Sequence, residues 1–81
     1  MTDSQEVETQ FIEELVELTH KRVEMAERVL KDPSDENLIE YNGVAEVQAY
    51  LRADLGIYPK LTAAEEAASA IWMKKRDELY Q

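Results

Sequence analysis

The sequence predicts an all-α fold, a three-helix bundle built on an antiparallel helical hairpin, in a single domain that spans residues 1–81. Three observations lead to this prediction. Apolar residues recur every three or four positions in three stretches, which is the period of a helix. Two short proline-containing segments, 31–35 and 56–62, separate these stretches. Only two glycines and two prolines are present, which leaves little room for many strands and turns.

The first helix is expected over residues 5–31. Its apolar residues form two rows, and spacings of three and four place each row on one side of a helix. The rows lie side by side, so their band is wider than a two-stranded coiled coil needs. Such a band can cover two neighbouring elements, or one element and a partner chain. The two rows are Phe11, Leu15, Leu18, Met25, Val29 and Ile12, Val16, Val23, Ala26, Leu30.

The second helix is expected over residues 35–55. Pro33 ends the first helix, and Ser34 or Asp35 caps the next one. Because the connection is short, the two helices should be antiparallel neighbours. Gly43 either lies inside a continuous helix or marks a break in it, and continuity is favoured because the apolar rows resume in register. The main apolar face is Tyr41, Val44, Val47, Leu51 and Leu55.

The third helix is expected over residues 63–80. Gly56 is placed to end the second helix in a left-handed conformation. Thr62 and Glu65 have the spacing of a capping box, in which each residue satisfies a backbone N–H group of the other. The five positions expected to be among the most buried of the whole chain are Leu15, Leu18, Val47, Leu51 and Ile71.

Charge and composition exclude several classes of function. The net charge is −9, which argues against binding to nucleic acid or to an anionic membrane surface. The absence of cysteine excludes disulfides and thiolate metal sites. No apolar run approaches a membrane span of about 20 residues and no signal peptide is evident, so a cytoplasmic location is expected. Residues 1–17 carry six acidic and no basic side chains, which fits either a solvated helix start or a surface for a basic partner.

One short motif has the spacing of a metal site. Glu17 and His20 form the Glu-x-x-His pattern of di-iron helical bundles, with Glu13 and Glu24 on the same side. These residues project away from the middle of the apolar band, whereas di-iron ligands project inward, so no metal or other cofactor is expected. No nucleophile elbow and no glycine-rich phosphate loop occur. The chain is therefore not expected to be an enzyme, and no catalytic residue is assigned.

Apolar residues outside a simple packing face indicate a protein-binding surface. Arg22 lies within the apolar band of the first helix, where it either pairs with an acid or Gln48 of another helix or marks the rim of an interface. Exposed contiguous apolar area usually marks a binding surface. A homodimer is the expected form, with a different protein partner as the alternative. The candidate protein-binding residues are Arg22, Met25, Leu38, Ile39, Tyr50 and Trp72.

The long first helix, the proline-marked turn and residues 43–52, with the sequence GVAEVQAYLR, resemble small acidic helical accessory proteins of tailed bacteriophages. The resemblance covers about half of the chain. It implies a non-enzymatic accessory role in virion assembly or host takeover, and no functional residue is transferred from it. The sequence thus predicts a protein-binding or assembly module. The alternative is an acidic inhibitor that mimics nucleic acid and occupies the basic site of a nucleic-acid-binding enzyme.

Overall fold

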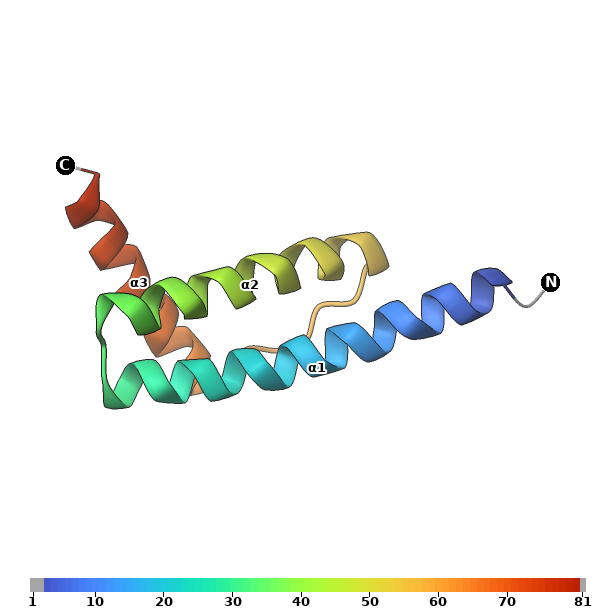
Figure 1. Ribbon diagram of the computed structural model, residues 1–81, viewed down its shortest axis with the longest axis horizontal. Coiled ribbons are helices and arrows are strands. Elements are labelled where there is room, and N and C mark those ends of the chain that lie inside the picture. Colours follow the sequence, from blue (N-terminus) through green and yellow to red (C-terminus); the bar gives the residue numbers. More distant parts are fainter. Residues whose placement is uncertain (1–2, 81) are drawn as a thin grey trace.

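The computed structural model describes the backbone of residues 3–80 and the side chains of residues 7–80, and it confirms a three-helix bundle (Figure 1). Helix α1 spans Asp3–Lys31, α2 spans Asp35–Leu55 and α3 spans Ala63–Leu79. Between residues 3 and 80 there is no strand. Helix α2 has the bounds expected from the sequence, whereas α1 begins slightly earlier and α3 ends one residue earlier.

The helix ends are formed by local polar contacts that the sequence predicts. The Ser34 hydroxyl accepts a hydrogen bond from the backbone N–H of Asn37, at 3.3 Å, and so caps α2. Gly56 ends α2 in the left-handed region, with φ of 68°. At the start of α3, Thr62 and Glu65 form the capping box: the Glu65 N–H donates to the Thr62 hydroxyl and the Thr62 N–H donates to the Glu65 carboxylate.

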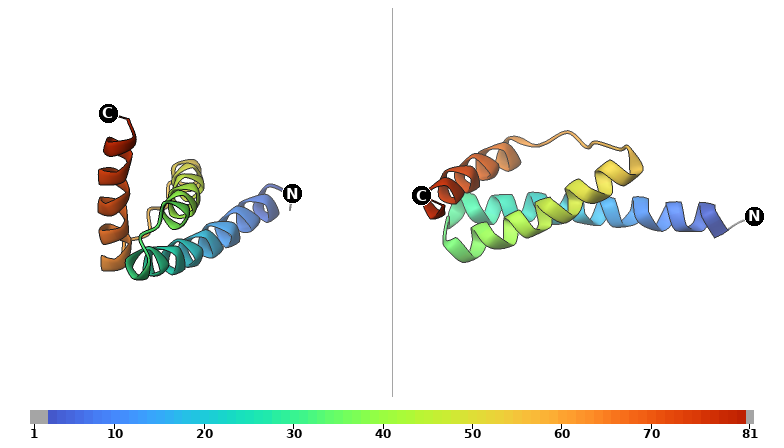
Figure 2. Two further views of the ribbon diagram at one scale, coloured as in Figure 1. Left: turned by 60° about the vertical axis from the view of Figure 1, so that its left-hand side comes forward. Right: turned by 90° about the horizontal axis from the view of Figure 1, so that it is seen from above.

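Helices α1 and α2 form the antiparallel hairpin, and α3 packs across its closed end (Figures 1 and 2). An extended segment, residues 57–62, carries the chain back from the open end of the hairpin to α3. Helix α1 has 29 residues and α2 has 21, so at about 1.5 Å per residue α1 is roughly 12 Å longer. The N-terminal part of α1 therefore extends beyond the end of α2 (Figure 1).

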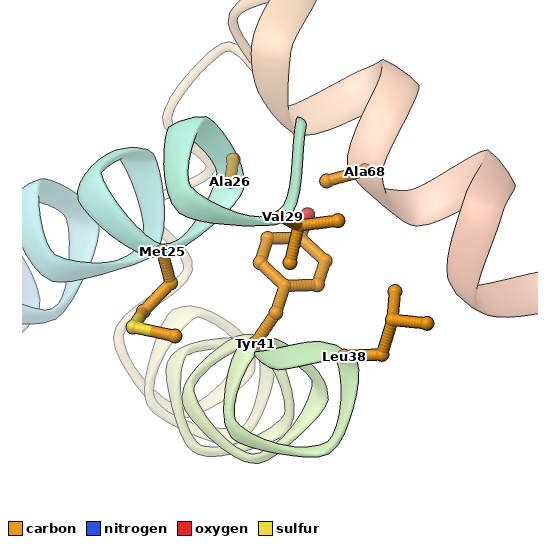
Figure 3. Packing of buried hydrophobic residues seen from close by; sticks show 6 residues of the cluster. All are labelled: Met25, Ala26, Val29, Leu38, Tyr41 and Ala68. Carbon is orange, nitrogen blue, oxygen red and sulfur yellow. The ribbon is translucent and has the colours of Figure 1, made fainter. Parts of the chain in front are cut away.

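The apolar core lies where all three helices meet, near the closed end of the hairpin. Tyr41 and Leu38 of α2 point toward Val29 of α1, and Ala68 brings the backbone of α3 close to this cluster (Figure 3). The small side chains of Ala26 and Ala68 are fully buried, which permits close packing of α3 on α1. The core cluster is Met25, Ala26, Val29, Leu38, Tyr41 and Ala68.

The expected list of most buried residues is only partly correct. Leu15 is buried, whereas Leu18, Leu51 and Ile71 are partly buried. Val47 is 52% exposed, so the prediction for this residue is wrong. Helix α2 is oriented so that Tyr41 faces both α1 and α3 and Gln48 faces α1, and this orientation turns Val47 toward the surface. The apolar period identifies a face but does not show which part of a wide face meets a neighbour.

Candidate functional site

An open groove runs between α1 and α2 on the surface of the hairpin. Its volume is about 580 Å³, and most of its lining is apolar. Leu18 and Met25 contribute from α1, and Val44 and Val47 contribute from α2. Two charged residues of opposite sign, Lys21 and Glu40, also line it. The full lining is Leu18, Lys21, Met25, Glu40, Gly43, Val44 and Val47.

Gly43 lies inside α2 without breaking it, which confirms the continuous helix predicted from the register of the apolar rows. A Cβ atom added at Gly43 would meet no heavy atom within 4 Å, so no other part of the described chain approaches its backbone closely. The glycine costs about 1 kcal/mol of helix stability relative to alanine. Within one chain, packing does not require it, and its effect is to leave the α2 side of the groove open.

A cluster of buried polar side chains lies next to the apolar core. Arg22 of α1 is at its centre, and its guanidinium is bonded to residues of both other helices. Its Nη1 donates a hydrogen bond to Oε1 of Gln48, at 2.7 Å, and its Nε donates to the Tyr41 hydroxyl, at 3.2 Å. The same Nε lies 3.3 Å from Oε2 of Glu65 in an ion pair. The cluster comprises Thr19, Arg22, Tyr41, Gln48, Glu65 and Ser69.

The polar cluster connects all three helices. The Tyr41 hydroxyl donates to the backbone carbonyl of Glu65, at 3.0 Å, and lies 2.7 Å from the Ser69 hydroxyl. The Gln48 amide donates to the Thr19 hydroxyl, at 3.0 Å. Arg22, Gln48 and Glu65 are each more than nine-tenths buried. The cluster therefore has a structural role, in which it fixes how α3 lies on the hairpin.

The six candidate protein-binding residues are not gathered on one surface. Arg22 and Leu38 are buried inside the chain, and Trp72 is partly buried against the core. Met25 is mostly buried, but its side chain still lines the groove. Ile39 and Tyr50 are exposed on α2. Arg22 pairs both with Gln48 and with an acid of another helix, Glu65, which are the two pairings that the sequence predicts for it. Whether any of the six residues contacts a partner stays a prediction.

Sequence reasoning missed the residues that open the groove. The sequence predicts Val44 and Val47 on the packing face of α2. Val44 does pack against the core while it also lines the groove, whereas Val47 is exposed in the groove. The spacing of Gly43 and Val47, four residues apart, is the signal that places them on one side of α2. The sequence predicts an acid of another helix as a possible partner of Arg22 but does not identify Glu65, because the capping box already accounts for that glutamate locally.

A second, smaller hollow lies between the start of α2 and α3. Its volume is about 220 Å³, and Lys75 there forms an ion pair with Asp35 at 3.0 Å. Lys74 and Glu78 also line it. Acidic and basic groups are both present, and the Lys75 ammonium already has a carboxylate partner, so the hollow is not selective for an ion of either sign.

The Glu-x-x-His motif lies on the exposed side of α1. Glu17, His20 and Glu24 are all exposed, as their projection away from the apolar band predicts. In the part of the chain that the structure describes, no three His, Asp or Glu side chains are grouped so that they could share a metal ion. Among the same residues, no helix has both the length and the apolar character needed to cross a membrane.

Comparisons with known protein families, with curated proteins and with solved structures give no match for this chain.

Proposed function

We propose that this chain is a non-enzymatic protein-binding or assembly module that binds its partner through the groove between α1 and α2. The observation that supports this proposal most directly is the exposure of Val47, which is 52% exposed beside three other apolar lining residues. Apolar side chains that remain accessible in an open groove are the usual mark of a protein-binding surface.

The apolar groove suits a helix or a similar apolar segment better than a small polar substrate. The lining offers a Lys21 ammonium and a Glu40 carboxylate, and no buried polar group converges on the groove from the other lining residues. An amphipathic helix that lies in such a groove buries its own apolar face against it. Ile39 and Tyr50, exposed on α2, would extend the contact on that helix. A homodimer is the form proposed, and an accessory role in a tailed bacteriophage remains a proposal on the resemblance alone.

Two matched variants test the groove. Val47→Glu places a charge in the groove, and Met73→Glu makes the same change on α3, where Met73 is 54% exposed outside the groove. Because both side chains are largely exposed, both variants should fold. Tagged wild-type protein and the two variants are used to capture proteins from a lysate of the source cell, and the bound proteins are identified by mass spectrometry. We expect binding, including capture of untagged copies of the chain, to persist in Met73→Glu and to be lost in Val47→Glu.

A nucleic-acid mimic is the second candidate function, and the acidic first half of α1 favours it. Glu8, Glu13, Glu14 and Glu17 are all exposed there, and the N-terminal end of α1 extends beyond α2 (Figure 1). A mimic would bind a basic site through these charges, so binding would weaken strongly when salt shortens the Debye length from about 10 Å at 0.1 M to about 3 Å at 1 M. Binding through the apolar groove should tolerate this change, and Val47→Glu would not abolish binding by a mimic.

A further inference from the structure

The apolar lining of the groove continues along α1 past the end of α2. Val7, Phe11, Leu18 and Met25 are spaced by four and seven residues, so they lie within about 40° of one another around the helix. Leu18 and Met25 belong to the groove, whereas Val7 and Phe11, nearer the N-terminus of α1, are 47% and 43% exposed. The C-terminal part of this row therefore lines the groove, and its N-terminal part forms an exposed apolar ridge.

The charges beside this row change sign near its middle. Glu14, Lys21 and Arg28 are spaced by seven residues and lie along one flank of the row, and all three are exposed. The acid lies before Leu18 and the two basic residues lie after it. Arg28 also forms an exposed ion pair with Glu40 of α2, at 3.8 Å, whereas Lys21 forms no ion pair with any side chain of residues 7–80.

A face with this pattern is complementary to the same face of a second copy in antiparallel orientation. If a two-fold axis passes near Leu18, Phe11 of one copy lies opposite Met25 of the other. The ridge of each copy then covers the groove of the other, and Glu14 lies within one residue of Lys21 of the second copy along the helix. In a parallel pair related by a two-fold axis along the helices, this flank of the two copies would lie on opposite sides of the contact, so Glu14 would not meet Lys21 and their attraction would be lost.

We propose that the partner in the groove is a second copy of this chain, with the two α1 helices antiparallel and crossing near Leu18, so that two hairpins form a four-helix core with α3 on the outside. This inference rests on the proposed function, because it uses the same groove. A two-fold arrangement is also the commonest symmetry of protein oligomers. The open space at Gly43 lets a helix of the second copy approach α2 closely.

Charge reversal tests the orientation. Sedimentation equilibrium at micromolar concentrations and moderate salt should show a monomer–dimer equilibrium for the wild-type chain. Glu14→Lys and Lys21→Glu each replace two attractive contacts with two repulsive ones, and each should weaken dimerisation by about tenfold. The double variant Glu14→Lys/Lys21→Glu restores opposite charges in the antiparallel pair and should recover the wild-type affinity. In a parallel pair, neither single variant would change the affinity in this way.

Cysteine cross-linking tests the crossing point independently, because the chain has no cysteine of its own. Leu18→Cys should form a disulfide-linked dimer under mild oxidation with diamide. Phe11→Cys is the matched control: its two copies would lie about 21 Å apart along the helices, whereas a disulfide needs Cα atoms within about 7 Å. A parallel pair would cross-link at both positions.

The outcomes separate this inference from the proposed function. A single 9.4 kDa species at all concentrations, or faster cross-linking at Phe11→Cys than at Leu18→Cys, would overturn the antiparallel dimer. If capture of another protein were still lost in Val47→Glu, the proposed function of the groove would stand. Capture or dimerisation that is unaffected by Val47→Glu would overturn both.

Discussion

Arg22 of α1 and Glu65 of α3 form a buried ion pair, with 3.3 Å between Nε and Oε2 and only 8% and 2% of the two side chains exposed. Glu65 also makes a second contact: its other carboxylate oxygen accepts a hydrogen bond from the Thr62 N–H in the capping box of α3. The contact that begins α3 and the contact that fixes α3 on α1 thus share one carboxylate. Docking of α3 is therefore coupled to the integrity of its first turn.

Loss of Arg22 should destabilise the fold strongly. Arg22→Leu leaves the Glu65 carboxylate buried without its cation, and breaking a buried pair in this way costs about 3–5 kcal/mol. Arg28→Leu is the matched control, because the Arg28–Glu40 pair is 61% and 51% exposed and exposed pairs contribute about 0–1 kcal/mol. Urea denaturation of both variants measures the free energy of unfolding. Equal effects at the two positions would contradict a structural role for the polar cluster.

The Tyr41 hydroxyl should contribute measurably to the free energy of unfolding. It accepts a hydrogen bond from Arg22 and donates one to the Glu65 carbonyl. Tyr41→Phe leaves these buried groups with one partner fewer, and an unsatisfied buried polar group costs about 1–3 kcal/mol. Tyr50→Phe removes the same atom from a residue that is 69% exposed, and its free energy of unfolding should remain unchanged. If Tyr41→Phe left the free energy of unfolding unchanged, water would have to replace the lost hydroxyl.

The helices, their caps and their antiparallel order could be predicted from sequence because local signals determine them. Ser34, Gly56 and the Thr62–Glu65 pair each act within a few residues of their own position. The position of Arg22 in an apolar row, and Gln48 as its partner, could also be anticipated, since a buried charge needs a polar partner.

The position of the groove could not be predicted from the same signals. Tyr41 and Val47 belong to one apolar face in the sequence, but they lie about 120° apart around α2. The direction from which α3 packs decides which of the two is buried. That direction depends on contacts between residues far apart in the chain, such as Arg22 with Glu65, so Tyr41 is buried and Val47 is left in the groove.

Purified protein should retain no tightly bound iron or zinc. Glu17, His20 and Glu24 are exposed on α1, where water competes for every ligand and a single such motif supplies half of a di-iron site. Elemental analysis after dialysis should find less than stoichiometric metal, and His20→Ala should leave that amount unchanged. Stoichiometric metal that disappears in His20→Ala would show that a second copy completes a site.

Substitution by alanine should change the stability of the fold in opposite directions at the two glycines. Gly43→Ala adds a methyl group in open space inside a helix, which should stabilise the chain by about 1 kcal/mol and raise the melting temperature by about 4–8 °C. Gly56→Ala places a Cβ on a residue with φ of 68°, where the left-handed conformation costs a non-glycine residue about 1–2 kcal/mol. Thermal unfolding at low protein concentration, where one chain unfolds alone, measures both.

The Gly43→Ala variant also tests the dimer, through the way its melting temperature depends on protein concentration. Dimerisation stabilises the folded state by mass action, so the wild-type melting temperature should rise with concentration. If a second copy packs against Gly43, the added methyl group occupies part of that contact. Gly43→Ala should then be more stable than the wild type when dilute and should gain less from an increase in concentration. A constant advantage over the whole range would show that no chain approaches the backbone of α2 at this residue.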